Sequence, residues 1–143
     1  MNDSFQGITV VITGGAGGIG SAAAAYFLER GAFVSIADID SERLQQVENS
    51  LYAYGERLLA VHETVASPEG SRRIIEETVS RFGSLNVLIN NASVVRDQLL
   101  LRMSVEQFDE VVDTNLKGVF YCTKAAIPYL QGERGGSVIN MIA

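Results

Sequence analysis

The chain has 143 residues, 47% of them hydrophobic and 20% charged, and this composition fits one globular domain. A formal net charge of -6 with only two lysines excludes the basic face that DNA or an anionic membrane requires, so we expect neither nucleic-acid nor membrane partners. One cysteine, Cys122, excludes an internal disulfide, and residues 1–7 lack the basic and apolar parts of a secretion signal. These features predict a cytoplasmic protein.

Five predicted strands alternate with helical segments along the chain. The strands are short apolar runs rich in β-branched residues, at 8–13, 32–38, 57–65, 85–90 and 135–143. Helix start signals follow three of them: a cap at Asp40 or Ser41, the pair Ser67-Pro68, and a capping box from Ser104 to Gln107. The alternation predicts an α/β fold with a doubly wound parallel sheet of the Rossmann type, in a single dinucleotide-binding domain over residues 1–143.

Apolar periodicity predicts which helix faces are buried. In the first helix the apolar face consists of Ile19, Ala22, Ala23, Tyr26 and Phe27. In the last helical stretch the inward positions are Phe108, Val111, Val112, Asn115, Leu116, Val119, Thr123, Ala126, Ile127 and Leu130. Asn115 must have a partner there, because an unpaired buried amide costs about 1–3 kcal/mol. The Thr123 hydroxyl is expected to bond back to its own helix.

The turn after the first strand has the dinucleotide-binding spacing Gly15-x-Gly17-x-x-Gly20. Its backbone N–H groups and the helix dipole favour a pyrophosphate. Asp38 ends the second strand 18 residues after Gly20, where an acid accepts hydrogen bonds from ribose hydroxyls. Its carboxylate would repel a 2′-phosphate, which favours NAD over NADP. A turn that only packs a helix on a strand, and a solvated strand-end aspartate, are the alternatives.

Four motifs stand in the order and spacing of a known family: Thr13-Gly14-x-x-x-Gly18-Ile19-Gly20, NNAS at 90–93, DTNLKGVF at 113–120 and GGSVIN at 135–140. The chain resembles the classical short-chain dehydrogenases/reductases over nearly its whole length. Residues 96–125 look similar to the 3-oxoacyl-(acyl-carrier-protein) reductase branch. The resemblance implies an NAD(H)-dependent oxidoreductase, a homo-oligomer, that transfers a hydride between nicotinamide and a small-molecule alcohol or carbonyl substrate.

The resemblance also implies roles for individual residues. The cofactor-binding positions are Gly14, Gly18, Ile19, Gly20, Asp38, Asn90 and Ala92. Asn115 matches the family's helix asparagine and is the one catalytic position present, acting through a backbone partner and a water of the proton relay. A satisfied core asparagine is the alternative from the residues alone. No metal site is expected, since His62 is the only histidine and Cys122 the only cysteine.

Three departures from the family pattern limit the expected chemistry. Ser93 replaces a glycine, and Thr64 replaces an aspartate that helps to hold adenine, so both weaken cofactor binding. Ala143 stands where the catalytic serine is expected, and no Tyr-x-x-x-Lys occurs in the sequence. We therefore expect the N-terminal half of such an enzyme, truncated after the fifth strand and inactive alone. The alternative is a non-catalytic nucleotide-binding or self-associating fragment with an unpaired fifth strand.

Overall fold

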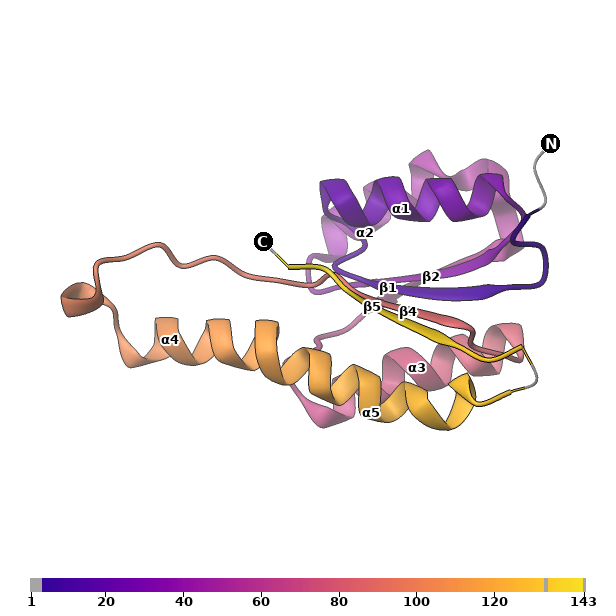
Figure 1. Cartoon of the computed structure of the whole chain (residues 1–143). Coiled ribbons are helices and arrows are strands. Elements are labelled where there is room, and N and C mark those ends of the chain that lie inside the picture. The colour runs from indigo at the N-terminus through magenta and orange to yellow at the C-terminus, as the bar shows by residue number, and fades with distance from the viewer. Residues whose placement is uncertain (1–3, 133, 143) are drawn as a thin grey trace.

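Five parallel strands form one sheet in the order β3-β2-β1-β4-β5 in the computed structural model, which describes residues 4–132 and 134–142. The strand bounds are β1 Thr9–Thr13, β2 Phe33–Asp38, β3 Leu58–His62, β4 Val87–Asn90 and β5 Ser137–Asn140. Figure 1 shows helices on both faces of the sheet, with α1 and α2 on one side and α3 and α5 on the other. This is the doubly wound arrangement that the sequence predicts. The order reverses at β1, so the crevice for a ligand lies at the carboxyl ends of β1 and β4.

The helices begin where the capping residues predict. Their bounds are α1 Gly18–Glu29, α2 Ser41–Ser50, α3 Pro68–Phe82, α4 Val105–Val111 and α5 Gly118–Leu130, with 3-10 turns at Tyr52–Arg57 and Leu100–Arg102 and a π-helical turn at Val112–Lys117. The Asp40 side chain accepts from the N–H of Arg43, and the Ser67 hydroxyl accepts from the N–H of Gly70. Ser104 and Gln107 form both bonds of the predicted capping box.

The central strand β1 separates two hydrophobic clusters. Val10 and Ile12 face the cluster under α1 and α2, whereas Val11 faces the cluster under α3 and α5. All five residues of β1 are buried, because helices cover the sheet on both faces. The glycine turn therefore starts from a strand that is fixed from both sides.

Only part of the apolar face predicted for the first helix meets the sheet: Ala23 and Phe27 are half-buried against the core, whereas the other predicted residues are exposed. α1 buries Gly20, Ala24 and Leu28, while Ile19 is 64% exposed and Tyr26 is 48% exposed. The helix is apolar almost all round, so periodicity does not single out one face. The predicted residues instead line a groove of about 580 Å³ whose far wall includes β5.

The last helical stretch is less regular than predicted. Figure 1 shows that α4 projects away from the sheet. The π-helical turn joins α4 to α5, and α5 packs against the sheet. Ala126 and Leu130 are buried as expected, but Phe108, Leu116 and Ile127 are 57%, 67% and 43% exposed. A π-helical turn shifts the register of the faces, and a helix beyond the sheet has no core to face.

The strands β3 and β5 are shorter than predicted. β3 ends at His62, and β5 ends at Asn140. Within the described residues β5 pairs with β4 alone, and each of its four residues is exposed. No helix in the described part of the chain is long and apolar enough to span a membrane.

Candidate functional site

The glycine turn is held in its shape by close contacts that leave no room for side chains at three positions, Gly14, Gly15 and Gly20; a Cβ at Gly15 would lie 2.5 Å from the Ile36 Cβ. Gly14 has a φ of +64°, and a Cβ there would lie 2.9 Å from the Ala92 Cα. A Cβ at Gly20 would lie 2.3 Å from the Gly14 carbonyl oxygen. At Gly18, by contrast, no described atom would lie within 4 Å of an added Cβ. The turn is packed tightly against β4 and is open above the first residue of α1.

The amino terminus of α1 has free hydrogen-bond donors. The first N–H groups of a helix have no acceptor within the helix. Among the described residues no side chain caps this end at Gly17, and both Gly18 and Ile19 are exposed. Uncapped N–H groups and the positive end of the helix dipole together suit an anion. This end of α1 therefore fits the diphosphate of a dinucleotide.

Asp38 lies at the carboxyl end of β2 and is tied to the glycine turn. Its Oδ2 accepts from the N–H of Ala16 at 3.0 Å, and its Oδ1 accepts from the N–H of Asp40 at 3.0 Å. A carboxylate has about four acceptor positions, so both oxygens can still accept from ribose hydroxyls. The two backbone bonds orient the carboxylate before any ligand arrives.

A pocket, which we name the strand-end pocket, lies at the carboxyl edge of the sheet beside Asp38. It is lined by Gly14, Ala37, Asp38, Ile39, Glu63, Thr64, Val65, Ala92, Ser93, Val94 and Thr114. The predicted positions Gly14, Asp38 and Ala92 are thus brought together, although they come from three different strand ends. None of these described lining residues is a lysine or an arginine.

The end of β4 is tied to the glycine turn by residues that the sequence argument did not single out. The Thr13 hydroxyl oxygen accepts from the N–H groups of Asn91 and Ala92, each at 3.0 Å. The Asn91 Nδ2 donates to the carbonyls of Thr13 and Gly14 at 3.1 and 3.2 Å. Adjacent asparagines at a strand end are the signal that could have identified this bridge, since an amide can donate and accept together.

Asn90, a predicted cofactor-binding position, is 4% exposed and directs its amide away from the turn. Its Nδ2 donates to the Thr123 hydroxyl at 3.2 Å and to the Asn140 Oδ1 at 2.9 Å. The sequence predicts that the Thr123 hydroxyl bonds back to its own helix; the contact found in the structure is one in which its oxygen accepts from β4 across the interface. The side chain of Asn90 joins β4 to β5 and α5.

Asn115 has the partner that its position demands. Its Oδ1 accepts from the N–H of Val94 at 2.8 Å, and its Nδ2 donates to the Val94 carbonyl at 2.9 Å. One amide thus satisfies both backbone groups of Val94, just after β4. Asn115 lies in the π-helical turn, a feature that often accompanies functional sites. The partner is confirmed, and the part in a proton relay remains a prediction.

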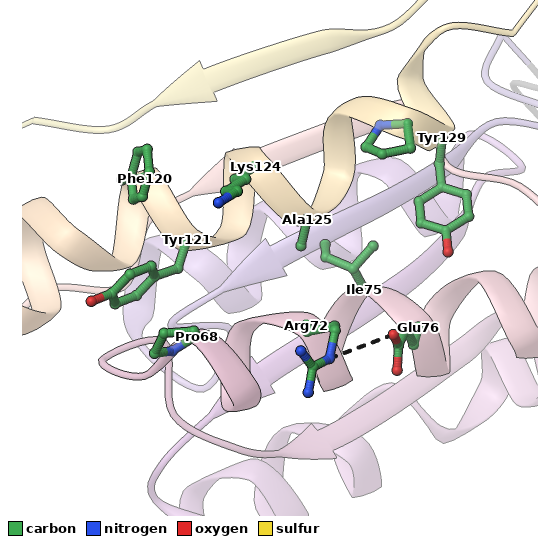
Figure 2. Close-up of a pocket in the computed structure, with 10 residues that line it drawn as sticks. Pro68, Arg72, Ile75, Glu76, Phe120, Tyr121, Lys124, Ala125 and Tyr129 are labelled. Atoms are coloured by element: carbon green, nitrogen blue, oxygen red, sulfur yellow. Dashed lines mark ion pairs between the residues drawn. The ribbon is translucent and has the colours of Figure 1, made fainter.

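A second hollow lies between α3 and α5, away from all the predicted site residues. Figure 2 shows aromatic side chains of α5, Phe120, Tyr121 and Tyr129, around it, with Arg72 and Glu76 on α3. The Arg72 and Glu76 side chains form an ion pair at 3.7 Å. None of the predicted cofactor positions in the described chain lines this hollow.

The remaining candidate groups carry no visible chemistry. Burial raises the pKa of the Cys122 thiol, and the Ser71 hydroxyl opposes this only in part. The Nε2 of His62 is bonded to the Ile39 carbonyl at 3.0 Å. Among the described residues no group of three potential metal ligands occurs. Ala143, at the expected serine position, lies outside the described residues.

The short chain dehydrogenase family matches residues 8–143 of this chain. The 3-oxoacyl-[acyl-carrier-protein] reductase FabG of Staphylococcus aureus (strain Mu50) is 40% identical over 134 residues, which are 93% of this chain and 54% of that protein. The FabG of Thermotoga maritima is 35% identical over 96% of this chain and 56% of its own length. The chain spans about half the length of the curated relatives it matches.

Solved structures agree with this match. A short-chain dehydrogenase/reductase from Brucella melitensis has a TM-score of 0.89 and 30% identity, covering 98% of this chain and 58% of its own. A short chain dehydrogenase from Burkholderia cenocepacia J2315 was solved in complex with NADP. It has a TM-score of 0.88 and 33% identity, and the match covers 95% of this chain and 55% of that one. The glycine turn, the strand order and these similarities lead to one conclusion: the chain belongs to the short chain dehydrogenase family.

Proposed function

We propose that this chain binds NAD(H) and forms the nucleotide-binding half of an oxidoreductase acting on an alcohol or carbonyl substrate. The observation that carries the proposal is the Asp38 carboxylate, oriented by the N–H groups of Ala16 and Asp40 beside the uncapped end of α1. A bound nicotinamide would supply the hydride exchange. The names of the Staphylococcus and Thermotoga relatives, which are reductases, support a carbonyl substrate.

Each part of the site has a physical task in this proposal. The N–H groups at Gly18 to Gly20 bind the diphosphate, and Gly14 lets the backbone of β4 approach closely. Asp38 accepts from the ribose hydroxyls. Ala92 lines the strand-end pocket beside them. Asn90 joins β4 to β5 and keeps the floor of the crevice in place.

The choice between NAD and NADP depends on charge at the ribose. The charged residues that line the described strand-end pocket are Asp38 and Glu63, and Glu63 is paired with the Arg73 guanidinium at 3.0 Å. A 2′-phosphate at the ribose would therefore meet the Asp38 carboxylate with no lysine or arginine among the described lining residues. This supports NAD. The Burkholderia structure with NADP supports the opposite preference. Binding titrations with both cofactors therefore decide the proposal.

Isothermal titration of the purified chain should show NAD binding at least tenfold tighter than NADP. Asp38→Ser should weaken NAD at least tenfold, because hydrogen bonds to a charged group contribute about 1.5–3 kcal/mol. Asp38→Asn is the matched control: it keeps an acceptor but removes the charge. It should therefore reduce the difference between the dissociation constants for NAD and NADP. NADP binding as tight as NAD to the unaltered chain would disprove the NAD assignment.

Asn115 acts as a positioning residue in this proposal. By holding both backbone groups of Val94, its amide sets the path of the chain next to Ala92 and Ser93 in the strand-end pocket. The proton relay that the family resemblance implies would then use the backbone around the π-helical turn, since both ends of the amide are already bonded.

A non-catalytic nucleotide-binding module is the second candidate. The sequence contains no Tyr-x-x-x-Lys, so within these 143 residues no tyrosine is placed to serve as the family's general acid. The purified chain should bind NAD and show no reduction of a 3-oxoacyl thioester or oxidation of simple alcohols, followed by absorbance of the reduced cofactor. Turnover by this chain alone would disprove the second candidate and require another proton donor.

A further inference from the structure

The hollow between α3 and α5 lies outside the proposed cofactor site. Its volume is about 370 Å³, which is within the range of small-molecule pockets, and its described lining residues belong to these two helices. Figure 2 shows Tyr121 at one end of the hollow and Tyr129 at the other, with Ile75 and Ala125 between them. Ile75 is fully buried and Ala125 is half-buried against the core, so the floor of the hollow is apolar.

The walls of the hollow are aromatic and open to solvent. Phe120 is 60% exposed and Tyr129 is 41% exposed. The rings of Phe120 and Tyr121 have centroids 5.8 Å apart and planes inclined at 59°. An exposed apolar patch that is also concave is typical of a binding site. Aromatic walls favour a planar ring as the ligand, because rings attract one another in offset and edge-to-face arrangements.

The charged groups at the hollow leave one cation without an acidic partner. Arg72 and Glu76 are paired with each other at 3.7 Å. Lys124 forms no ion pair with another described residue, and its ammonium lies 5.8 Å from the centroid of the Phe120 ring. Two positive charges and one negative charge give the lining a net charge of +1, whereas the whole chain carries -6. The hollow therefore suits an anion.

From these features we infer that the hollow binds a small planar aromatic carboxylate, with its ring between Tyr121 and Tyr129 and its carboxylate at the Lys124 ammonium. A ligand that brings its own carboxylate compensates the lysine. An apolar surface of another protein molecule would instead remove water from the ammonium without pairing it, and that is unfavourable. This binding is independent of the proposed function, because no predicted cofactor position among the described residues lines the hollow.

The probe is 2-naphthoate, and 2-naphthamide, which has the same ring without the charge, is its neutral counterpart. Titration of the 143-residue chain, followed by ligand-observed NMR, should give a dissociation constant for 2-naphthoate below about 1 mM and about threefold or more below that for 2-naphthamide. Lys124→Gln should abolish this preference for the anion. Lys117→Gln is the matched control, because it removes the same charge from a lysine already paired with Asp113 at 3.0 Å, and it should leave the preference unchanged.

Ala125→Leu tests the location of the binding. The larger side chain fills the floor of the hollow, so both probes should bind about tenfold more weakly. Circular dichroism and a thermal melt confirm that the variant is folded. Tyr129→Ala is the second variant: it removes an exposed end wall of the hollow and should weaken both probes about threefold.

Several results would overturn the inference. One is the absence of 2-naphthoate binding at millimolar concentrations, and another is unchanged binding of both probes by folded Ala125→Leu and Tyr129→Ala. Displacement of bound 2-naphthoate by NAD would place the probe in the nucleotide crevice instead. Weaker 2-naphthoate binding at higher protein concentration, together with larger species in sedimentation velocity, would show that a second copy of the chain covers the hollow. If the chain fails to bind NAD but binds 2-naphthoate as described, the proposed function is wrong and this inference stands.

Discussion

Two glycines of the same turn, Gly20 and Gly18, differ in the space around them, and substitution separates their roles. Gly20→Ala should lower the free energy of unfolding by about 1–3 kcal/mol, because its Cβ would be forced against the Gly14 carbonyl at 2.3 Å. Urea denaturation followed by circular dichroism measures this loss.

Gly18→Ala is the counterpart at an open position. Its methyl group meets no described atom within 4 Å, and alanine favours a helix by up to about 1 kcal/mol over glycine, so the free energy of unfolding should stay the same or rise. NAD binding should nevertheless fall at least tenfold, because the methyl group occupies the space assigned to the diphosphate. Undiminished NAD binding by this variant would contradict that assignment.

Asn115 offers a test of a half-buried amide that bonds to two backbone groups. Asn115→Ala should lower the free energy of unfolding by about 1–3 kcal/mol, because it leaves the N–H and the carbonyl of Val94 without their partner. Asn115→Asp keeps the acceptor for the Val94 N–H, but above pH 6 its ionised carboxylate sets a second oxygen against the Val94 carbonyl, so we expect a loss at least as large as that of Asn115→Ala. Thermal and urea unfolding of both variants give the comparison. Equal stability of all three proteins would show that water replaces the amide fully.

At the scale of elements, α4 differs from the other helices because it does not pack on the sheet. All of α4 lies in the described part of the chain, and none of its residues is buried. It is held by its capping box and by Arg96, whose guanidinium pairs with Glu110. Exposed pairs of this kind contribute about 0–1 kcal/mol. The stability of α4 is therefore local.

Ser104→Ala tests this local stability. Loss of an N-cap costs about 1 kcal/mol, so amide exchange in residues 105–111 should speed up about fivefold while the global melting temperature barely changes. Hydrogen exchange read by mass spectrometry measures the segment directly.

Ser67→Ala is the matched control, because the helix it caps buries Ile74 and Ile75 in the core. There the same loss of a cap should lower the global free energy of unfolding by about 1 kcal/mol. A drop in global stability from Ser104→Ala as large as that from Ser67→Ala would contradict the separation of α4 from the core.

At the scale of the whole molecule, β5 and the groove beside it leave apolar surface open. Val138, Ile139 and Met141 are 36%, 42% and 45% exposed, and the far edge of β5 has no strand partner within the described residues. An unpaired apolar edge is a template for pairing with another chain. We therefore expect this 143-residue chain to self-associate.

Sedimentation velocity at micromolar concentrations should show species larger than the monomer. Ile139→Lys places a charge in the groove and should shift the distribution toward the monomer. Ser80→Lys, which changes the net charge equally on an exposed position of α3, should leave the distribution as it was. A monomeric unaltered chain would show that the exposed edge alone does not drive association.

The order of elements and the glycine turn could be predicted from sequence because they depend on local signals. Short β-branched runs, the caps at Asp40, Ser67 and Ser104, and the glycine spacing each act within a few residues. The same locality explains the position of Asp38, since a strand end is set by its own residues. Asn115 could be identified as needing a partner, because an amide on an apolar stripe must be satisfied.

Other features could not be predicted because they depend on which elements meet. The buried face of α1 depends on the sheet beneath it, and a helix that is apolar all round does not reveal that face. Thr13 and Asn91, which bond to each other, lie 78 residues apart in sequence. Thr123 bonds to β4 because the fold brings a donor near its hydroxyl.

By itself, the sequence determined the alternation of strands and helices, the helix starts and the glycine turn, because backbone propensities, caps and glycine conformations act over a few residues. Tertiary structure alone decided that the Asn115 amide serves Val94, that Asn90 faces β5, and that Thr64 shares a pocket with Asp38. Those contacts arise only when parallel strands align their carboxyl ends at one edge of a sheet, and no spacing along the chain records that alignment.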